Sequence, residues 1–157
     1  MEEVARAAGV SRSTAYRRFP TKEDVVLEIP NRWLVAYDEA VAGLDPTASL
    51  VEALEIAAGA VAAHIDANID RVRTAYAILA EAPSLNVAGV ANTEWLQRIA
   101  ELARRHGGHD EETAKVIAGA YMGGLDAMMF HWASGGGADS VVDATRRAHE
   151  RMKSLLS

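Results

Sequence analysis

The stretch VARAAGVSRSTAYRRFPTKED, residues 4–24, decides how the N-terminal part of this chain is expected to fold. Gly9 follows a first helical pattern and suits a C-cap, and Ser11 is a good N-cap for a second helix. Small residues on the facing sides of the two patterns allow the close helix crossing that a helix-turn-helix requires. The sequence therefore predicts a helix-turn-helix built from residues 1–8 and 11–19.

The charge of the chain is divided between a basic start and an acidic remainder. Residues 1–22 hold five basic and two acidic side chains, whereas the rest holds 11 basic and 20 acidic ones. Phosphate attracts the first part and repels the second. The alternative is that the basic helix is only a solvated surface. Here the caps, the helix crossing and the charge asymmetry all favour a DNA-binding role instead. We expect phosphate and base-edge donors from Ser11, Arg12, Ser13, Thr14, Arg17 and Arg18.

This stretch resembles the DNA-binding signature of the tetracycline-repressor (TetR) family of one-component regulators. The matching residues are Val4-Ala5, Ala8-Gly9-Val10-Ser11, Ser13-Thr14, Tyr16, Phe19 and Thr21-Lys22-Glu23. The resemblance implies that Ser11, Tyr16 and Lys22 contact phosphates, while Ala15 and Phe19 pack inside the head. Tyr16 has an alternative interpretation as a half-buried core aromatic.

The sequence departs from the family pattern in two places. The family has a further helix ahead of this point, and nothing precedes Met1 that would supply it. A shortened chain, a misassigned start or an incomplete record would each explain this. Without that helix, the head of these 157 residues is expected to be loosely packed or to repack, whereas a misassigned start would mean that the natural head is whole. An uncovered large side chain forgoes about 1.5–3 kcal/mol of burial. The second departure is Pro30, which is expected to kink or break the helix that starts at Thr21.

Apolar spacings and caps predict helices throughout the remainder of the chain. The expected ranges are 21–43, 49–66, 69–82, 93–106, 110–132 and 141 to the C-terminus. The predicted fold is all-α, with a partial helix-turn-helix DNA-binding head at residues 1–29 and a helical effector-binding and dimerisation domain at residues 30–157. The absence of cysteine and of a 20-residue apolar run favours a cytoplasmic protein without a membrane segment.

The helix expected at residues 110–132 has one small face and one large apolar face. The resemblance implies that the last two helices pair with those of a second copy, which would make a homodimer. Its two recognition helices would lie about 34–36 Å apart on a pseudo-palindromic operator of double-stranded DNA. Packing of both faces within one chain is the alternative. The interface residues that we expect are Gly119, Ala120, Gly123, Gly124, Ala127, Thr145, Ala148 and Met152.

Large, adaptable side chains within the helical body are candidates for a small-molecule site. For each of them, ordinary core packing is the alternative. The acidic body favours a neutral or cationic effector. The candidate ligand-binding residues are Tyr76, Trp95, Tyr121, Met122, Asp126, Met129 and Phe130.

The sequence lacks the motifs of the common enzyme and cofactor sites. His106, His109 and Asp110 could suggest a metal, but the Gly107-Gly108 pair between them is typical of a helix end. We therefore expect no catalytic residues, no cofactor and no metal. The expected function is a transcriptional repressor whose operator affinity is modulated by a small molecule. The alternative is a dimeric small-molecule-binding protein with a vestigial head, and a helical-bundle enzyme would need a polar cluster that the sequence does not display.

Overall fold

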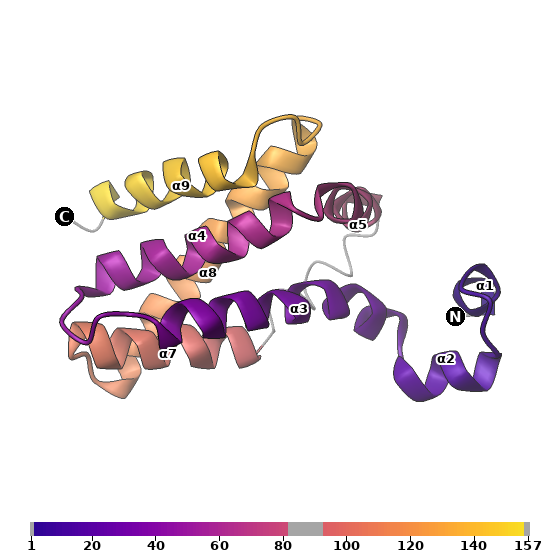
Figure 1. Ribbon diagram of the computed structural model, residues 1–157, viewed down its shortest axis with the longest axis horizontal. Coiled ribbons are helices and arrows are strands. Elements are labelled where there is room, and N and C mark those ends of the chain that lie inside the picture. The colour runs from indigo at the N-terminus through magenta and orange to yellow at the C-terminus, as the bar shows by residue number, and fades with distance from the viewer. Residues whose placement is uncertain (1, 82–92, 156–157) are drawn as a thin grey trace.

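The computed structural model describes residues 2–81 and 93–155, and every regular element in those ranges is an α-helix (Figure 1). The all-α prediction is therefore confirmed, with boundaries within about two residues of the expected ones. The helices are α1 (Glu2–Ala7), α2 (Arg12–Arg18), α3 (Lys22–Ala42), α4 (Leu50–Asp66), α5 (Ile69–Glu81), α7 (Thr93–Gly107), α8 (Glu111–Ser134) and α9 (Val141–Leu155).

Side-chain caps start the helices of the N-terminal part where the sequence predicts them. The Ser11 hydroxyl accepts a hydrogen bond from the Thr14 amide at 3.1 Å, which satisfies a free donor at the start of α2. Thr21 and Asp24 form a capping box at the start of α3, and the Asp24 carboxylate accepts from the Thr21 amide at 2.8 Å. Gly9 has a φ of 66°, which a residue with a side chain rarely adopts.

Helix α3 runs unbroken from Lys22 to Ala42, so the break predicted at Pro30 is wrong. Proline removes one backbone hydrogen bond of the helix, and it also crowds the preceding turn. The turns that follow are held by packing, because Leu34 and Tyr37 are buried against the body. Tertiary burial of this kind offsets a local propensity against helix.

The body contains two apolar cores, and α4 contributes to both. The first core joins α3, α4, α7 and α8 through Leu34, Tyr37, Ala53, Leu54, Ala57, Ala58, Trp95, Ile99, Leu102, Ala118 and Tyr121. The second core joins α4, α5, α8 and α9 through Ala62, Ile65, Val72, Tyr76, Met129, Trp132, Val141 and Ala144. Trp33 of α3 packs against both cores.

Helices α1 and α2 lie apart from the body, and α3 connects them to it (Figure 1). Ala5 of α1 and Ala15 of α2 are buried, as the small-residue crossing predicts. This arrangement places the predicted DNA-contacting residues at one end of the molecule, with both cores at the other end of α3. Within residues 2–81 and 93–155, no helix is long and apolar enough to cross a membrane.

Candidate functional site

The predicted recognition helix, α2, presents its polar side chains to solvent. Arg12, Ser13, Tyr16, Arg17 and Arg18 are exposed, and Tyr16 retains 40% of its accessible surface. An exposed ring is able to reach a phosphate with its hydroxyl, so the placement favours the phosphate-contact role over the half-buried core role. Lys22 starts α3, but its side chain is outside the part of the structure that is described.

Three hydroxyl groups gather at the start of α2. The Ser11 Oγ lies 3.0 Å from the Oγ of Ser13 and 2.8 Å from the Oγ1 of Thr14. Helix N-termini and hydroxyl side chains both hydrogen-bond phosphate oxygens. The cluster therefore places three hydroxyl groups, which are suited to phosphate oxygens, beside the arginines of the same helix.

Arg12, a predicted DNA contact, interacts with both helices of the head. Its guanidinium forms an ion pair with Glu2 of α1, and it lies 5.5 Å from the centre of the Tyr16 ring. The carboxylate of Glu2 competes with any phosphate for this guanidinium.

The candidate ligand-binding residues are divided between the two cores. Trp95, Tyr121 and Met122 belong to the first core, where the Trp95 and Tyr37 rings lie edge to face with centres 5.5 Å apart. Tyr76, Met129 and Phe130 belong to the second core, and the rings of Tyr76 and Phe130 lie 5.3 Å apart at 66°.

Asp126 of α8 is the acidic member of the candidate set. Its side chain is partly buried, and this burial raises the pKa of its carboxyl group. Burial also raises the pKa of the Tyr76 hydroxyl, and the charge of Asp126 raises it further. The structure thus places Asp126 close enough to Tyr76 for its charge to act on the Tyr76 hydroxyl.

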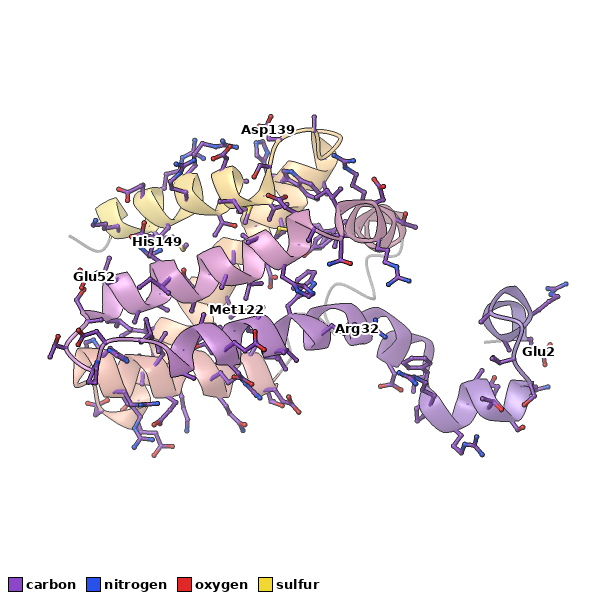
Figure 2. All side chains as sticks on the ribbon, viewed as in Figure 1. Glu2, Arg32, Glu52, Met122, Asp139 and His149 are labelled. Carbon is purple, nitrogen blue, oxygen red and sulfur yellow. The ribbon has the colours of Figure 1, made fainter. Side chains whose placement is uncertain are left out.

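The structure adds functional candidates that sequence reasoning missed. Trp33 and Tyr37 lie four residues apart on α3, so an apolar face on that helix would have been the signal for them. Another residue that sequence reasoning missed is His149 of α9. It is only 4% exposed, and it points from α9 toward α4 (Figure 2). Its Nδ1 lies 3.3 Å from the Tyr121 hydroxyl, and its Nε2 lies 3.9 Å from Glu55. In the part of the chain that is described, its Nε2 and the buried Nε1 of Trp95 have no hydrogen-bond partner.

The small face of α8 is on the surface of the single chain. Gly119, Ala120, Gly123 and Ala127 are all exposed. Val116, one turn earlier, keeps 67% of its surface exposed, which is unusual for a valine. An open stripe of small residues would allow another helix to approach closely.

The other predicted interface residues lie closer to the interior of the chain. Gly124 faces α9, where a Cβ at position 124 would overlap the sulfur of Met152. Thr145 is buried, and Ala148 and Met152 are partly buried. Gly124 therefore already serves a close approach within one chain, between α8 and α9.

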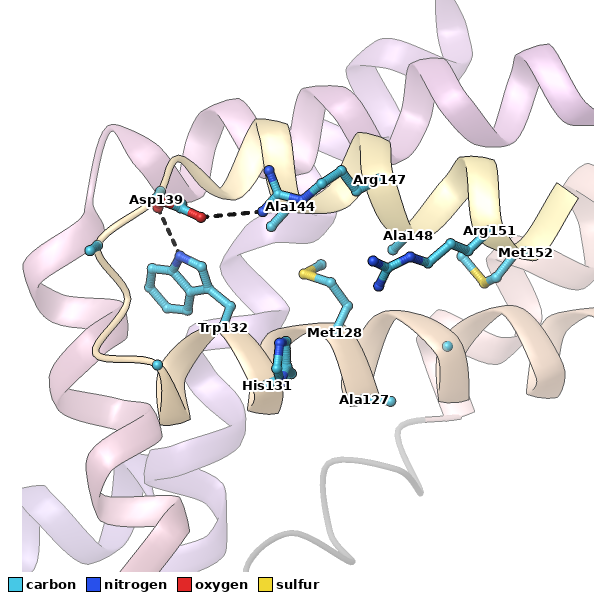
Figure 3. Close-up of a pocket in the computed structure, with 13 residues that line it drawn as sticks. Ala127, Met128, His131, Trp132, Asp139, Ala144, Arg147, Ala148, Arg151 and Met152 are labelled. Carbon is cyan, nitrogen blue, oxygen red and sulfur yellow. Dashed lines mark hydrogen bonds and ion pairs between the residues drawn. The ribbon is translucent and has the colours of Figure 1, made fainter. Parts of the chain in front are cut away.

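A pocket of about 440 Å³ lies between α8, α9 and the loop that joins them (Figure 3). At one end of it the Trp132 indole N–H donates to the Asp139 carbonyl at 2.8 Å, and the Arg147 guanidinium lies 3.4 Å from the Asp139 carboxylate. Ala127, Met128, Ala148 and Met152 form much of its apolar wall. The sequence analysis did not predict this pocket, because it depends on how α8 and α9 cross.

The His106–Asp110 segment has the helix end that the glycine pair predicts. Helix α7 ends at Gly107, and Gly108 has a φ of 65°. A ring nitrogen of His106 lies 2.9 Å from the Ala48 carbonyl oxygen, and Asp110 caps α8 by accepting from the Thr113 amide. His106 and Asp110 therefore have structural roles, His106 in a contact with the backbone at Ala48 and Asp110 as a helix cap.

Two family models together match most of the chain. Residues 1–29 match the bacterial regulatory proteins of the tetR family, and residues 48–157 match the MftR C-terminal domain. The chain belongs to the TetR family. It is therefore a DNA-binding transcription regulator with a C-terminal ligand-binding and dimerisation domain, and TetR-family regulators are not enzymes. No curated protein sequence matches it significantly.

Proposed function

We propose that this TetR-family chain is a homodimeric transcriptional repressor whose operator affinity is modulated by a small molecule. The observation that carries the proposal is the path of α3. One uninterrupted helix starts beside the recognition helix and delivers Trp33 to both cores of the body. A ligand that repacks either core would therefore move a helix that ends at the DNA-binding head.

The DNA contacts in this proposal come from α2 and the start of α3. The exposed guanidinium groups of α2 supply charge, and the hydroxyl cluster at its start supplies neutral donors. Binding would be driven largely by phosphate neutralisation, which releases counterions and depends steeply on salt. The residues assigned to this role are Ser11, Arg12, Ser13, Thr14, Tyr16, Arg17, Arg18 and Lys22.

The effector is assigned to the body, near the two aromatic pairs. Effector binding shifts operator affinity only if the effector prefers one of the two arrangements of α3. In a repressor that is released by its effector, the preferred arrangement is the one in which the heads no longer match the operator spacing. The residues assigned to the effector are Tyr76, Trp95, Tyr121, Met122, Asp126, Met129 and Phe130.

Dimerisation is assigned to the open face of α8 together with α9. A two-fold axis near Gly123 would let two copies of α8 cross closely, since Gly119 and Ala120 also lack bulky side chains. The same axis would repeat the recognition helix, which matches a pseudo-palindromic operator.

The test is binding of duplex DNA from the gene's own upstream region, measured at several salt concentrations. The 157-residue chain is compared with a chain that is extended by the codons immediately upstream of Met1. The proposal predicts saturable binding by at least one of them, with two chains per operator and an affinity that falls steeply with salt. Absence of operator binding by both would overturn it.

The alternative function is a dimeric small-molecule-binding protein with a vestigial head. The ion pair between Arg12 and Glu2 favours it, because it neutralises one of the cations of the recognition helix. This alternative predicts that both chains form dimers and bind small molecules while remaining indifferent to DNA.

A further inference from the structure

Asp126 is a partly buried acid whose carboxyl group has no partner in the described part of the chain. Among the side chains that the structure describes, no hydrogen bond or ion pair reaches its carboxylate, and burial is the cause of its raised pKa. A partly buried carboxylate normally gains a donor or a cation that offsets its lost hydration. Departures from this pattern are frequent at ligand sites.

The sequence limits which residues outside the described side chains could supply a basic partner. Residues 82–92 read APSLNVAGVAN and contain no lysine, arginine or histidine. Residues 25–31 and 77–81 contain none either. On α5, which also packs against α8, Arg73 already donates to the Gly137 carbonyl at 2.6 Å. A cation for Asp126 therefore has to come from outside these parts of the chain.

The surroundings of Asp126 are suited to an organic cation with an apolar body. Phe130 follows Asp126 by one helical turn, and its ring packs edge to face with that of Tyr76. Aromatic rings attract cations through their negative faces, and the attraction grows when water is excluded. Met122 and Met129 flank the acid on the same helix, and methionine adapts its shape to varied ligands.

We propose that the effector carries a protonated amine or quaternary ammonium group, which pairs with Asp126 beside Tyr76 and Phe130. The inference rests on the proposed function, because it assigns the effector's chemical class within the same domain. The apolar remainder of the effector packs against the second core. Trp33 of α3 contacts that core, so a ligand bound there shifts α3 through Trp33.

The experiment compares three probes that share one skeleton and differ in charge. Phenethylamine is cationic at neutral pH, phenethyl alcohol is neutral, and phenylacetate is anionic. Binding of each is measured by calorimetry at pH 7 on the wild-type protein, on Asp126→Asn and on the control Asp70→Asn. Asp70 lies on α5 with a highly exposed side chain that pairs with Arg73, so its substitution removes the same charge from open solvent.

The inference predicts that the wild-type protein binds phenethylamine at least tenfold more tightly than either other probe. Asp126→Asn removes this preference, and Asp70→Asn keeps it. Equal binding of the three probes, a preference for phenylacetate, or a preference that survives Asp126→Asn would overturn the inference. Operator binding is measured on the same samples. Retained operator binding without a cation preference refutes this inference alone, whereas a cation preference without operator binding refutes the proposed function alone.

Discussion

The hydroxyl group of Tyr121 on α8 lies 3.3 Å from Nδ1 of His149 on α9, and both side chains are buried. The same hydroxyl donates to the carbonyl oxygen of Leu54 on α4 at 3.2 Å. Helices α4, α8 and α9 therefore meet at one phenol oxygen. Buried polar groups of this kind stabilise a fold only while their partners are present.

Tyr121→Phe is expected to lower the free energy of unfolding by about 1–3 kcal/mol, because it leaves the buried His149 nitrogen without its partner. Urea denaturation at a fixed protein concentration measures this, since dimerisation also affects stability. The matched control is Tyr16→Phe on the exposed surface of α2, which should change stability by less than about 0.5 kcal/mol. Equal stabilities for both variants would show that the buried Tyr121 hydroxyl does not stabilise the fold.

Asp66, at the end of α4, caps the start of α9 and gives a prediction about pH. Its carboxylate accepts from the Ser140 hydroxyl at 2.6 Å and from the Val141 amide at 2.7 Å. Partial burial opposes ionisation, but the hydrogen bonds outweigh it and the pKa of Asp66 lies below its ordinary value. The contribution to stability is therefore fully present above the unfolded pKa of about 3.9, and it is lost as pH falls through the folded pKa.

Asp66→Ala should destabilise the protein by about 1–2 kcal/mol at pH 7, in the range of lost helix caps. The difference from wild type should shrink as the solution is acidified below about pH 4, because the wild-type carboxylate is then protonated too. Denaturation at pH 7 and at several acidic pH values checks this. A difference that stays constant with pH would show that the ionised cap is not the cause.

The Glu2–Arg12 ion pair predicts that the head restrains its own DNA contact. Glu2→Gln frees the guanidinium and removes a negative charge near the phosphates, so operator affinity should rise by up to about fivefold. Glu101→Gln, on the exposed surface of α7, removes an equal charge from a pair with Arg104 and should leave affinity unchanged. Fluorescence anisotropy with labelled duplex measures both, and a rise that is equal in the two variants would indicate a general charge effect.

The open face of α8 gives a prediction for assembly. A Cβ at Gly123 meets nothing within 4 Å, so Gly123→Leu should leave the single chain folded. If two copies cross there, the added side chain raises the dimer dissociation constant by at least about tenfold, in sedimentation measurements. Gly59→Leu on α4 has equally open space and should leave dimerisation unaltered. Dimers of unchanged stability in Gly123→Leu would place the interface elsewhere.

Local contacts explain why much of the fold could be predicted from the sequence. The caps at Ser11 and Thr21 depend on residues only three positions away, so the sequence alone is enough to predict where these helices begin. The break that was one of the two outcomes expected at Pro30 does not occur, because the packing of α3 offsets the local disadvantage of a proline within a helix. The family signature at residues 4–24 allowed the function to be predicted from sequence, since its motif lies within one short segment.

The candidate site depended more on long-range contacts, and the sequence predicted it less well. The bond between Asp66 and Val141 spans 75 residues, and no spacing rule connects them. The candidate ligand-binding residues were chosen by side-chain type, and the structure divides them between two cores. Trp33 was missed because its importance comes from touching both cores, which only the fold reveals.

The most direct test of the central claim is the salt dependence of binding to operator DNA by the purified protein and by its Arg17→Ala variant. Each phosphate contact contributes about −0.9 to the slope of log affinity against log salt. We predict a steep negative slope for the wild-type protein and a slope that is shallower by about one for the variant. Binding that is independent of salt, or undetectable even at low salt, would contradict the assignment of α2 as the element that contacts DNA.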